Sequence, residues 1–204
     1  MTHVDRIARI RIELDGIAPA VWRTVEIPLT TSLTGLHEVI QAVMLFDNCH
    51  LFQFDVGDKR YAIPDPEWDD ERETHDATGT TLATVVDHGV GSFSYTYDFG
   101  DNWQHTVTIE AIADADPALD YPRFIDGAHR APPEDVGGIP GFEHFLDAMA
   151  KPRHPERKRL IQWYGRPFNP DDIDLPEITT RIGKITRRRA RGKASSAKAQ
   201  GSLH

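Results

Sequence analysis

The sequence contains a single cysteine, Cys49, among 204 residues. This scarcity excludes an internal disulfide and a zinc knuckle built from several cysteines, and it favours a reducing compartment. The chain also lacks the run of about 18 apolar residues that a membrane helix requires. Its first residues, MTHVDRIARIRIEL, contain no apolar segment of a signal peptide. We therefore expect a soluble, cytoplasmic protein that does not span a membrane.

Acidic residues are absent from the C-terminal end of the chain. From Arg181 onward there are eight Lys or Arg residues, whereas the rest of the chain has 15 basic and 32 acidic residues. The segment 186–204 is poor in apolar residues, so we predict a disordered basic tail. Between Arg187 and Lys198 this tail either binds nucleic acid or folds back on the acidic body, and the charge of the body favours the second alternative.

The pattern of apolar residues predicts the fold class of residues 1–185. Period-two alternation predicts a hairpin over 6–28 and a second hairpin around the turn Gly57-Asp58, and apolar residues at helical spacing, with Thr34 as the cap, predict a helix ending near Met44. Short helices are expected over 81–89, 142–151, 155–165 and 175–185. We therefore expect a single α+β domain: a mostly antiparallel sheet of hairpins, one early packed helix and a helical C-terminal third.

The stretch YTYDFGDNWQH, residues 95–105, predicts a third hairpin. A loop of three residues, 100–102, would place Tyr97 opposite His105 and Phe99 opposite Trp103, so that aromatic residues share one face. Asn102 is suited to the left-handed conformation that such a loop needs. We call residues 95–105 the corner.

Polar residues of the corner have two interpretations each. His105 is either a core histidine bonded to a tyrosine or a carbonyl, or a ligand contact at the edge of an aromatic pocket. Asp98, on the face opposite to the aromatic one, and Asp101, at the tip, either hold the turn backbone or belong to a site. In this register Asp98 and His105 do not form a catalytic pair.

The stretch HRAPPEDVGG, residues 129–138, is a second candidate region, which we call the PPED loop. Its two prolines stiffen the chain, and Glu134 and Asp135 project from that rigid segment. Arg130 is close enough in sequence to pair with one of them. The loop is either a connection held by its own salt bridge or a carboxylate pair for a metal or a basic ligand.

Several stretches resemble the plasmid pRiA4b ORF-3-like family, whose members are also described as TnpR-like passenger proteins of insertion elements. The resemblance rests on AVWRTVEIP, TGLHEVIQAVMLFDNCHLFQF, YTYDFGDNWQHTVTIE and RAPPEDVGG, with a weaker match at WYGRPFNPDDIDL, and it spans about residues 7–175. It implies a compact α+β fold and a link with plasmids and mobile elements, and no established activity. The matching positions are Trp22, Arg23, His37, Gln41, His50, Tyr97, Asp98, Phe99, Gly100, Asp101, Trp103, His105, Arg130, Pro132, Pro133, Glu134, Asp135, Gly137 and Gly138.

The chain departs from the pattern of this family at four positions. Phe46 stands where tryptophan is frequent, Phe52 where a second histidine is frequent, and Phe124 and Ala131 where cysteines are frequent. These replacements weaken a metal site that is built on histidine and cysteine. The sequence also contains no recognisable serine nucleophile of a serine recombinase, so recombinase activity does not follow from the TnpR label.

Three functional hypotheses remain open at this stage. The first is a non-enzymatic accessory or interaction module without a metal, with a groove between the Tyr97–His105 corner and the Arg130–Gly138 loop. The second is a metal-dependent hydrolase that uses Glu134 and Asp135, with Asp98 or Asp101 and a histidine, His50 or His105, as further ligands. In the third, all these motifs are architectural. The candidate ligand-binding residues are Trp22, Arg23, His50, Tyr97, Asp98, Asp101, Trp103, His105, Arg130, Glu134 and Asp135.

Overall fold

A computed structural model describes residues 5–63 and 73–201 of the chain, with side chains up to residue 192. The elements are β1 (Arg6–Leu14), β2 (Val21–Pro28), α1 (Leu33–Met44), β3 (Phe52–Val56), β4 (Lys59–Ala62), β5 (Thr74–Asp76), α2 (Leu82–Asp87), β6 (Ser92–Tyr97), β7 (Trp103–Asp114), β8 (Arg123–Ala128), α3 (Gly138–Ala150), α4 (Arg157–Tyr164) and α5 (Leu175–Gly201). The expected α+β class is confirmed. Among the described residues, no helix combines the length and the apolar character needed to cross a bilayer.

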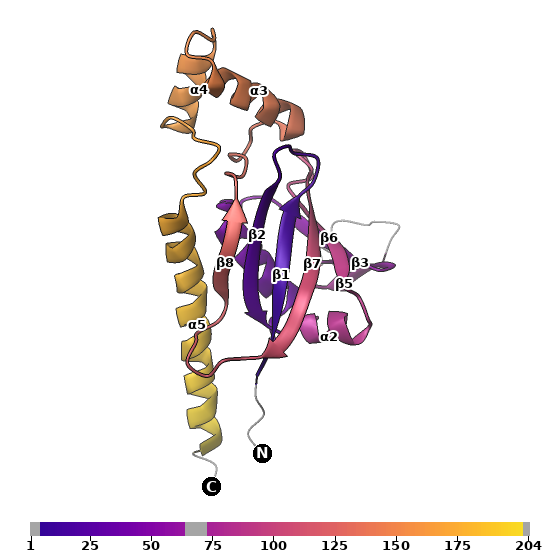
Figure 1. The fold of residues 1–204 in the computed structure, drawn as a ribbon. Coiled ribbons are helices and arrows are strands. Elements are labelled where there is room, and N and C mark those ends of the chain that lie inside the picture. Colours follow the sequence, from indigo (N-terminus) through magenta and orange to yellow (C-terminus); the bar gives the residue numbers. More distant parts are fainter. Residues whose placement is uncertain (1–4, 64–72, 202–204) are drawn as a thin grey trace.

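The strands form one sheet of eight in the order β5-β4-β3-β6-β7-β1-β2-β8 (Figure 1). Every neighbouring pair is antiparallel except β4 and β5. The hairpins predicted over 6–28 and around Gly57-Asp58 are both present. Strand β8 was not predicted, because the charges and the glycine of RFIDGA hide its alternation. The acidic stretch PDPEWDDERETHD, residues 64–76, ends in the short strand β5, and its residues 64–72 lie outside the described residues.

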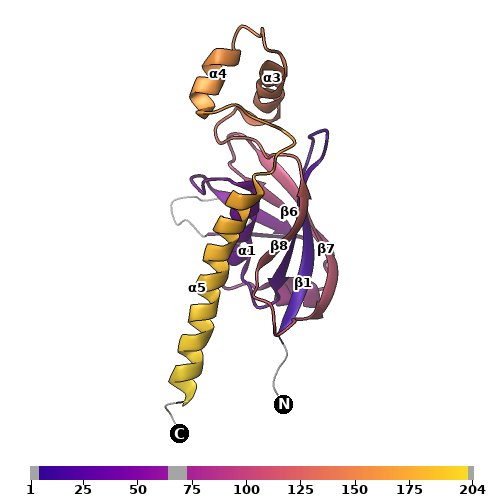
Figure 2. The same ribbon diagram turned by 60° about the vertical axis from the view of Figure 1, so that its left-hand side comes forward.

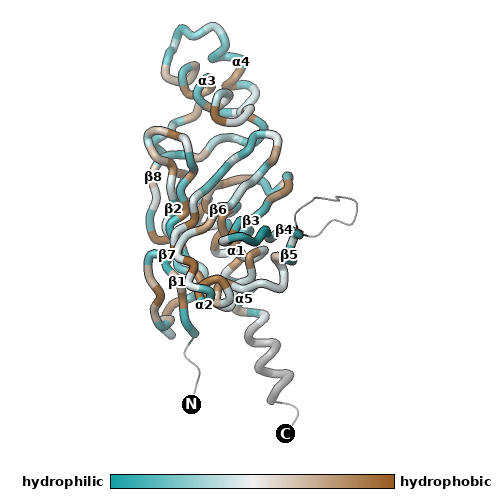
Figure 3. The backbone as a smooth tube through the Cα atoms, turned by 90° about the vertical axis from the view of Figure 1, so that its right-hand side faces the viewer, coloured by the Kyte–Doolittle hydropathy of each residue, from teal (hydrophilic) through white to brown (hydrophobic). Residues whose placement is uncertain are grey.

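Helix α1 lies across one face of the sheet, and α5 runs beside α1 and β8 (Figures 1 and 2). Leu36, Val39, Ile40 and Val43 of α1 are fully buried in the core, which drives the packing of this helix onto the sheet. The helix begins two residues earlier than predicted, because the Oγ of Ser32, rather than that of Thr34, accepts a bond at the start of the helix, from the backbone N–H of Gly35. Helices α3 and α4 form a separate pair at one end of the sheet, joined by a hydrophilic loop (Figure 3).

The structure differs from the predicted disordered tail, because α5 continues without a break from 175 to 201. Ile178 and Ile182 are buried and fix the first half of the helix, and the Ala, Arg and Lys residues that follow are good helix formers. Thr186 donates to the carbonyl of Pro122 at 2.7 Å, and Arg188 pairs with Glu38. The first part of the basic segment thus lies against the acidic body. The division of the chain into a domain of residues 1–185 and a tail of residues 186–204 stays a prediction.

The register of the corner differs by two residues from the predicted one. Tyr97 pairs with Trp103 and Tyr95 pairs with His105, so five residues, 98–102, join β6 to β7. The aromatic face is retained, but the His105 ring lies beside Tyr95, with ring centroids 5.4 Å apart, rather than beside Tyr97. Phe99 is outside the strand and 46% exposed.

Asp98 ends strand β6 earlier than the apolar pattern indicates. Its backbone is left-handed at φ 54°, as is that of Asn102 at φ 55°, which confirms the prediction for Asn102. Oδ1 of Asp98 accepts bonds from the N–H groups of Gly100 at 2.9 Å and Asp101 at 3.3 Å. This side-chain turn stops the alternation. The side chain of Asp98 is therefore buried in the corner and does not point to the opposite strand face.

Candidate functional site

Three segments that are distant in the sequence meet at one end of α1: residues 45–51 after this helix, the corner and the PPED loop. The first is held by a buried network in which Nε2 of His37 lies 2.7 Å from Oδ1 of Asn48 and Nδ1 of His37 lies 2.7 Å from the Tyr95 hydroxyl. The ring of His37 stacks on Phe52 at 3.7 Å. Gln41 accepts from the N–H of Asn48 and donates to Tyr95. These contacts fix the backbone that carries His50.

His50 is the centre of a cluster of carboxylates. Its Nε2 atom lies 3.0 Å from Oδ1 of Asp135, 3.5 Å from Oδ2 of Asp98 and 3.9 Å from Oε2 of Glu134. One ligand atom from each of His50, Asp98 and Asp135 lie within 4.8 Å of one another. The same holds for a second set, formed by Cys49, His50 and Glu134. The two sets share His50 and define the candidate site.

The carboxylates of Asp98, which is buried, and Glu134, which is partly buried, are anchored in the same way. Oδ1 of Asp98 accepts the hydrogen bonds of the corner turn, and Oδ2 faces His50. Glu134 uses Oε1 to accept from the N–H of Asp47 at 2.6 Å and from the Tyr97 hydroxyl at 3.0 Å. Its Oε2 is buried without a hydrogen-bond partner. Each side chain is thus fixed by one oxygen and presents the other to the cluster.

The corner and the PPED loop contact each other directly. Oδ2 of Asp101 accepts from the N–H of Gly137 at 3.1 Å. A Cβ atom at Gly138 would lie 2.8 Å from the backbone oxygen of Asp101, so only glycine fits at this position. The two regions therefore dock on each other rather than face each other across a groove. Their contact places Glu134 and Asp135 beside Asp98.

The electrostatics of the cluster favour a cation. Within the described side chains, the ion pairs of Asp98, Glu134 and Asp135 all go to His50. Burial raises the pKa of Glu134. Burial also raises the pKa of the Cys49 thiol, and the charges of Glu134 and Asp135 act in the same direction. Three carboxylates around one imidazole thus form a site in which acidic groups predominate.

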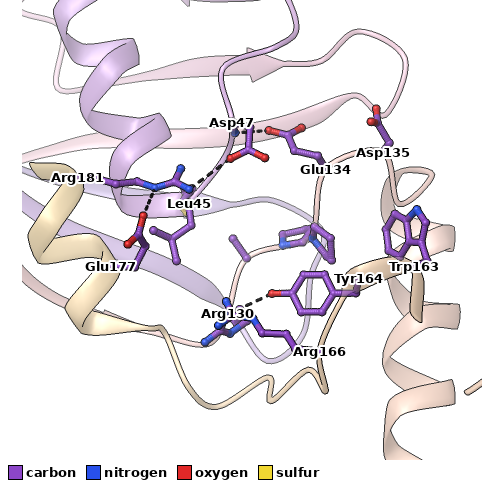
Figure 4. A pocket seen from close by; sticks show the side chains of 14 residues that line it. Leu45, Asp47, Arg130, Glu134, Asp135, Trp163, Tyr164, Arg166, Glu177 and Arg181 are labelled. Atoms are coloured by element: carbon purple, nitrogen blue, oxygen red, sulfur yellow. Dashed lines mark hydrogen bonds and ion pairs between the residues drawn. The ribbon is translucent and has the colours of Figure 1, made fainter. Parts of the chain in front are cut away.

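Two hollows flank the cluster. One, of 410 Å³, lies between the PPED loop, the end of α1 and helices α4 and α5, and Glu134 and Asp135 border it (Figure 4). Its arginines are engaged: Arg181 pairs with Asp47 and Glu177, and Arg130 donates to Tyr164. The other, of 260 Å³, lies between α1, β3 and β4, and His50 borders it. The cluster is therefore open from two sides.

Five predicted site residues lie elsewhere. Arg23 is fully buried in β2, and its guanidinium donates to the carbonyls of Val43, Trp22 and Ala128. Burial lowers the pKa of Arg23 to about 10. Arg130 was expected to pair within its own loop, and it pairs instead with Asp172 at 3.1 Å and Asp174 at 3.5 Å. The pairing prediction was wrong because residues 169–174 return beside the loop.

Aromatic and imidazole groups among the other predicted residues are packed away from the cluster. Trp22 lies under the guanidinium of Arg11 at 4.1 Å. Trp103 is buried against Phe142. His105 is fully buried, and its Nδ1–H donates to the carbonyl of Trp103, which is the core interpretation. These three residues support the framework of the site.

Two contributors to the site were not among the predicted residues. Cys49 was noted only for the absence of a partner cysteine, and Asp47 was not singled out, although both lie in the stretch TGLHEVIQAVMLFDNCHLFQF that resembles the family. A further sequence signal is their position close to His50 in the stretch DNCH. These polar residues closely follow the predicted amphipathic helix that ends near Met44, and this position is what could have indicated that they belong to the site.

Comparison with known proteins identifies the family of the chain. A family described as plasmid pRiA4b ORF-3-like protein matches residues 6–177. The uncharacterized protein y4hQ of Sinorhizobium fredii (strain NBRC 101917 / NGR234) is 39% identical over 163 residues, which cover 79% of this chain and 82% of that protein. The crystal structure of MM3350, a protein of unknown function from Methanosarcina mazei Go1, matches with a TM-score of 0.77 and 29% identity, over 87% of this chain and 98% of that one. The chain therefore belongs to the plasmid pRiA4b ORF-3-like protein family.

Proposed function

We propose that the protein is a metal-dependent hydrolase in which His50, Asp98 and Asp135 hold one divalent transition metal ion. The observation that carries the proposal is the convergence of three ligand atoms, from three separate loops, to within 4.8 Å. An imidazole nitrogen with carboxylate oxygens suits Zn²⁺ or Mn²⁺. With three protein ligands, a fourth coordination position of the metal stays open for a water molecule, as a catalytic centre requires.

Glu134 is placed to act as the general base. Its Oε2 is buried without a hydrogen-bond partner and lies 3.9 Å from Nε2 of His50. A metal ion held by His50, Asp98 and Asp135 would supply an activated water, and Glu134 would accept the proton of that water as its oxygen attacks the substrate. The proton then passes from Glu134 to the leaving group when the scissile bond breaks. Burial raises the pKa of Glu134 towards the range that suits a base at neutral pH.

Metal binding is tested first, on full-length protein purified without a histidine tag. We expect about one Zn²⁺ or Mn²⁺ per chain by mass spectrometry after loading and dialysis. Asp98→Asn is the sharp variant, because the amide oxygen can still accept the two turn bonds while the charge facing His50 is lost. Affinity by calorimetry should fall at least tenfold. The control is Glu143→Gln, which alters an exposed carboxylate of α3.

The same variant separates this proposal from a purely architectural role of the corner. If Asp98→Asn lowers the unfolding midpoint and leaves metal affinity unchanged, the charge serves the fold and the metal site is refuted. Absence of bound metal in the unaltered protein refutes it as well.

Hydrolysis is tested with p-nitrophenyl acetate and bis-p-nitrophenyl phosphate. We expect a metal-dependent rate with at least one of them. Glu134→Gln retains the acceptor for Tyr97 and Asp47 but removes the base, so the rate should fall about 100-fold or more while metal content stays constant. A rate that is independent of metal or of Glu134 would contradict this mechanism.

The accessory and nucleic-acid-binding alternative receives less support from the geometry. Arg188 pairs with Glu38, and Arg189 donates to Thr30, so part of the basic segment is engaged with the body. Removal of residues 186–204 tests this alternative. If removal abolishes a salt-dependent affinity for DNA or RNA, the basic segment is a nucleic-acid arm after all.

A further inference from the structure

The hollow of 260 Å³ beside His50 is bordered by apolar side chains as well as by polar ones such as Glu38 and Arg60. Its walls come from the start of α1, from β3 and β4 and from the corner residue Phe99. Leu51, Ile63 and Phe99 line it and are 56%, 58% and 46% exposed. They are three of the six large apolar side chains exposed in the part of the chain that the structure describes. Such a local concentration of exposed apolar surface is typical of a binding site.

The position of this hollow relates it to the cluster. His50 borders the hollow and is also the shared member of both ligand sets. Leu51 follows His50, and Phe99 follows Asp98, so two of the exposed apolar residues are direct chain neighbours of two candidate metal ligands. A molecule bound in the hollow therefore has one end at the cluster.

The volume limits what the hollow can hold. Pockets for drug-sized ligands measure about 300 to 1,000 Å³, and this one lies just below that range at 260 Å³. It suits a single aromatic ring or a short alkyl chain. The hollow on the other side of the cluster is lined by paired charges and offers less to an apolar group.

We propose that this hollow is the apolar subsite for the substrate, and that the substrate carries a short acyl chain or an aromatic ring next to the bond that is cleaved. The inference rests on the proposed function, because it assumes that the cleaved bond lies at the metal. It specifies a substrate class, a small amphiphilic ester, amide or related compound, that the metal cluster alone does not define.

The test uses hydroxamates, which bind metal ions through two oxygens. Acetohydroxamate, hexanohydroxamate and benzohydroxamate are titrated into the metal-loaded protein by calorimetry. Each buried methylene contributes about fourfold in affinity, so the two larger probes should bind at least tenfold more tightly than acetohydroxamate. Leu51→Asp and Phe99→Asp should remove this difference, with metal content and the affinity for acetohydroxamate unchanged. Leu119→Asp, an exposed apolar residue elsewhere, is the matched control and should retain the difference.

The outcomes separate the two proposals. If metal binds and the three probes have equal affinity, or if Leu51→Asp and Phe99→Asp change nothing, the apolar subsite is refuted while the metal centre stands. If no metal binds, the proposed function fails, and the same probes are titrated into the metal-free protein by ligand-observed NMR. Binding there that depends on the apolar group and on Leu51 supports the subsite, and its absence refutes it.

Discussion

The hydroxyl of Tyr97 donates a hydrogen bond of 3.0 Å to Oε1 of Glu134 and accepts one of 3.1 Å from the N–H of Cys49. A single side chain at the end of β6 thereby joins the PPED loop to the loop that carries His50. This oxygen atom, together with the N–H of Asp47 that also donates to Glu134, holds the candidate base beside the loop that carries His50.

Replacement of Tyr97 by Phe should loosen the site and leave the core intact. The ring retains its packing against Phe46, but two hydrogen bonds are lost, at a cost of about 1 to 2 kcal/mol in the free energy of unfolding. Metal affinity should also fall. Chemical denaturation and calorimetric titration measure the two effects. Tyr121→Phe removes the exposed bond to Asp116 and is the control, expected to change stability by less than about 0.5 kcal/mol.

Replacement of Gly138 by Ala should separate the PPED loop from the corner. The position has φ 65°, and the added Cβ would lie 2.8 Å from the backbone oxygen of Asp101. We expect a loss of about 2 to 4 kcal/mol in unfolding free energy, together with weaker metal binding.

Gly57→Ala provides the matched control for this effect. Gly57 has a similar φ of 63°, and a Cβ there would meet no atom within 4 Å. Only the backbone strain of about 1 to 2 kcal/mol should remain, with metal binding unchanged. Equal losses in the two variants would mean that strain, and not contact with Asp101, determines the effect at Gly138.

The sequence predicted most strands and helices because their burial follows from local alternation, as in Ile10, Ile12 and Leu14 of β1. It failed at the corner because the apolar pattern runs on through Phe99, whereas the side-chain turn of Asp98 stops the strand at Tyr97. A hydrogen bond from a side chain to its own backbone leaves no trace in the spacing of apolar residues.

The members of the candidate site were largely predictable, but their arrangement was not. Glu134 and Asp135 were selected because they are carboxylates on a rigid loop, Asp98 because it lies in the corner, and His50 because it matches the family. His50 and Asp135 are nevertheless 85 residues apart and meet only in the folded chain. Arg130 illustrates the opposite error. The sequence predicted an ion pair with a carboxylate of its own loop, whereas in the structure Arg130 pairs with the distant Asp172. Proximity that results from the packing of distant segments cannot be inferred from local spacing.

Replacement of Arg23 by Met should destabilise the fold without direct effect on the cluster. The guanidinium is fully buried and donates to three backbone carbonyls, including that of Val43 at the end of α1. Loss of these donors leaves buried acceptors unpaired, and we expect a cost of about 2 to 4 kcal/mol in unfolding free energy. Arg153→Met, at an exposed position, is the control. Similar stability of the two variants would show that water replaces the lost donors.

The stability of the protein should fall steeply as pH decreases from about 6.5 towards 4, because two histidines are buried in their neutral form. Burial lowers the pKa of both His37 and His105 to about 4. Between this value and the pKa of the unfolded chain, the unfolded state binds more protons than the folded state, so acid favours unfolding. Each histidine contributes up to about 1.4 kcal/mol per pH unit in this window. The contribution is fully present above the window and is lost as pH falls through it.

His105→Gln isolates one of the two contributions, since Gln retains a donor for the carbonyl of Trp103. Urea denaturation at a series of pH values should give a slope of unfolding free energy against pH that is smaller by about 1.4 kcal/mol per unit below pH 6.5. NMR titration of the imidazole signals provides the direct measurement. An unchanged slope in the variant, or an imidazole that titrates near 6.5, would contradict the assignment of His105 as a neutral core residue.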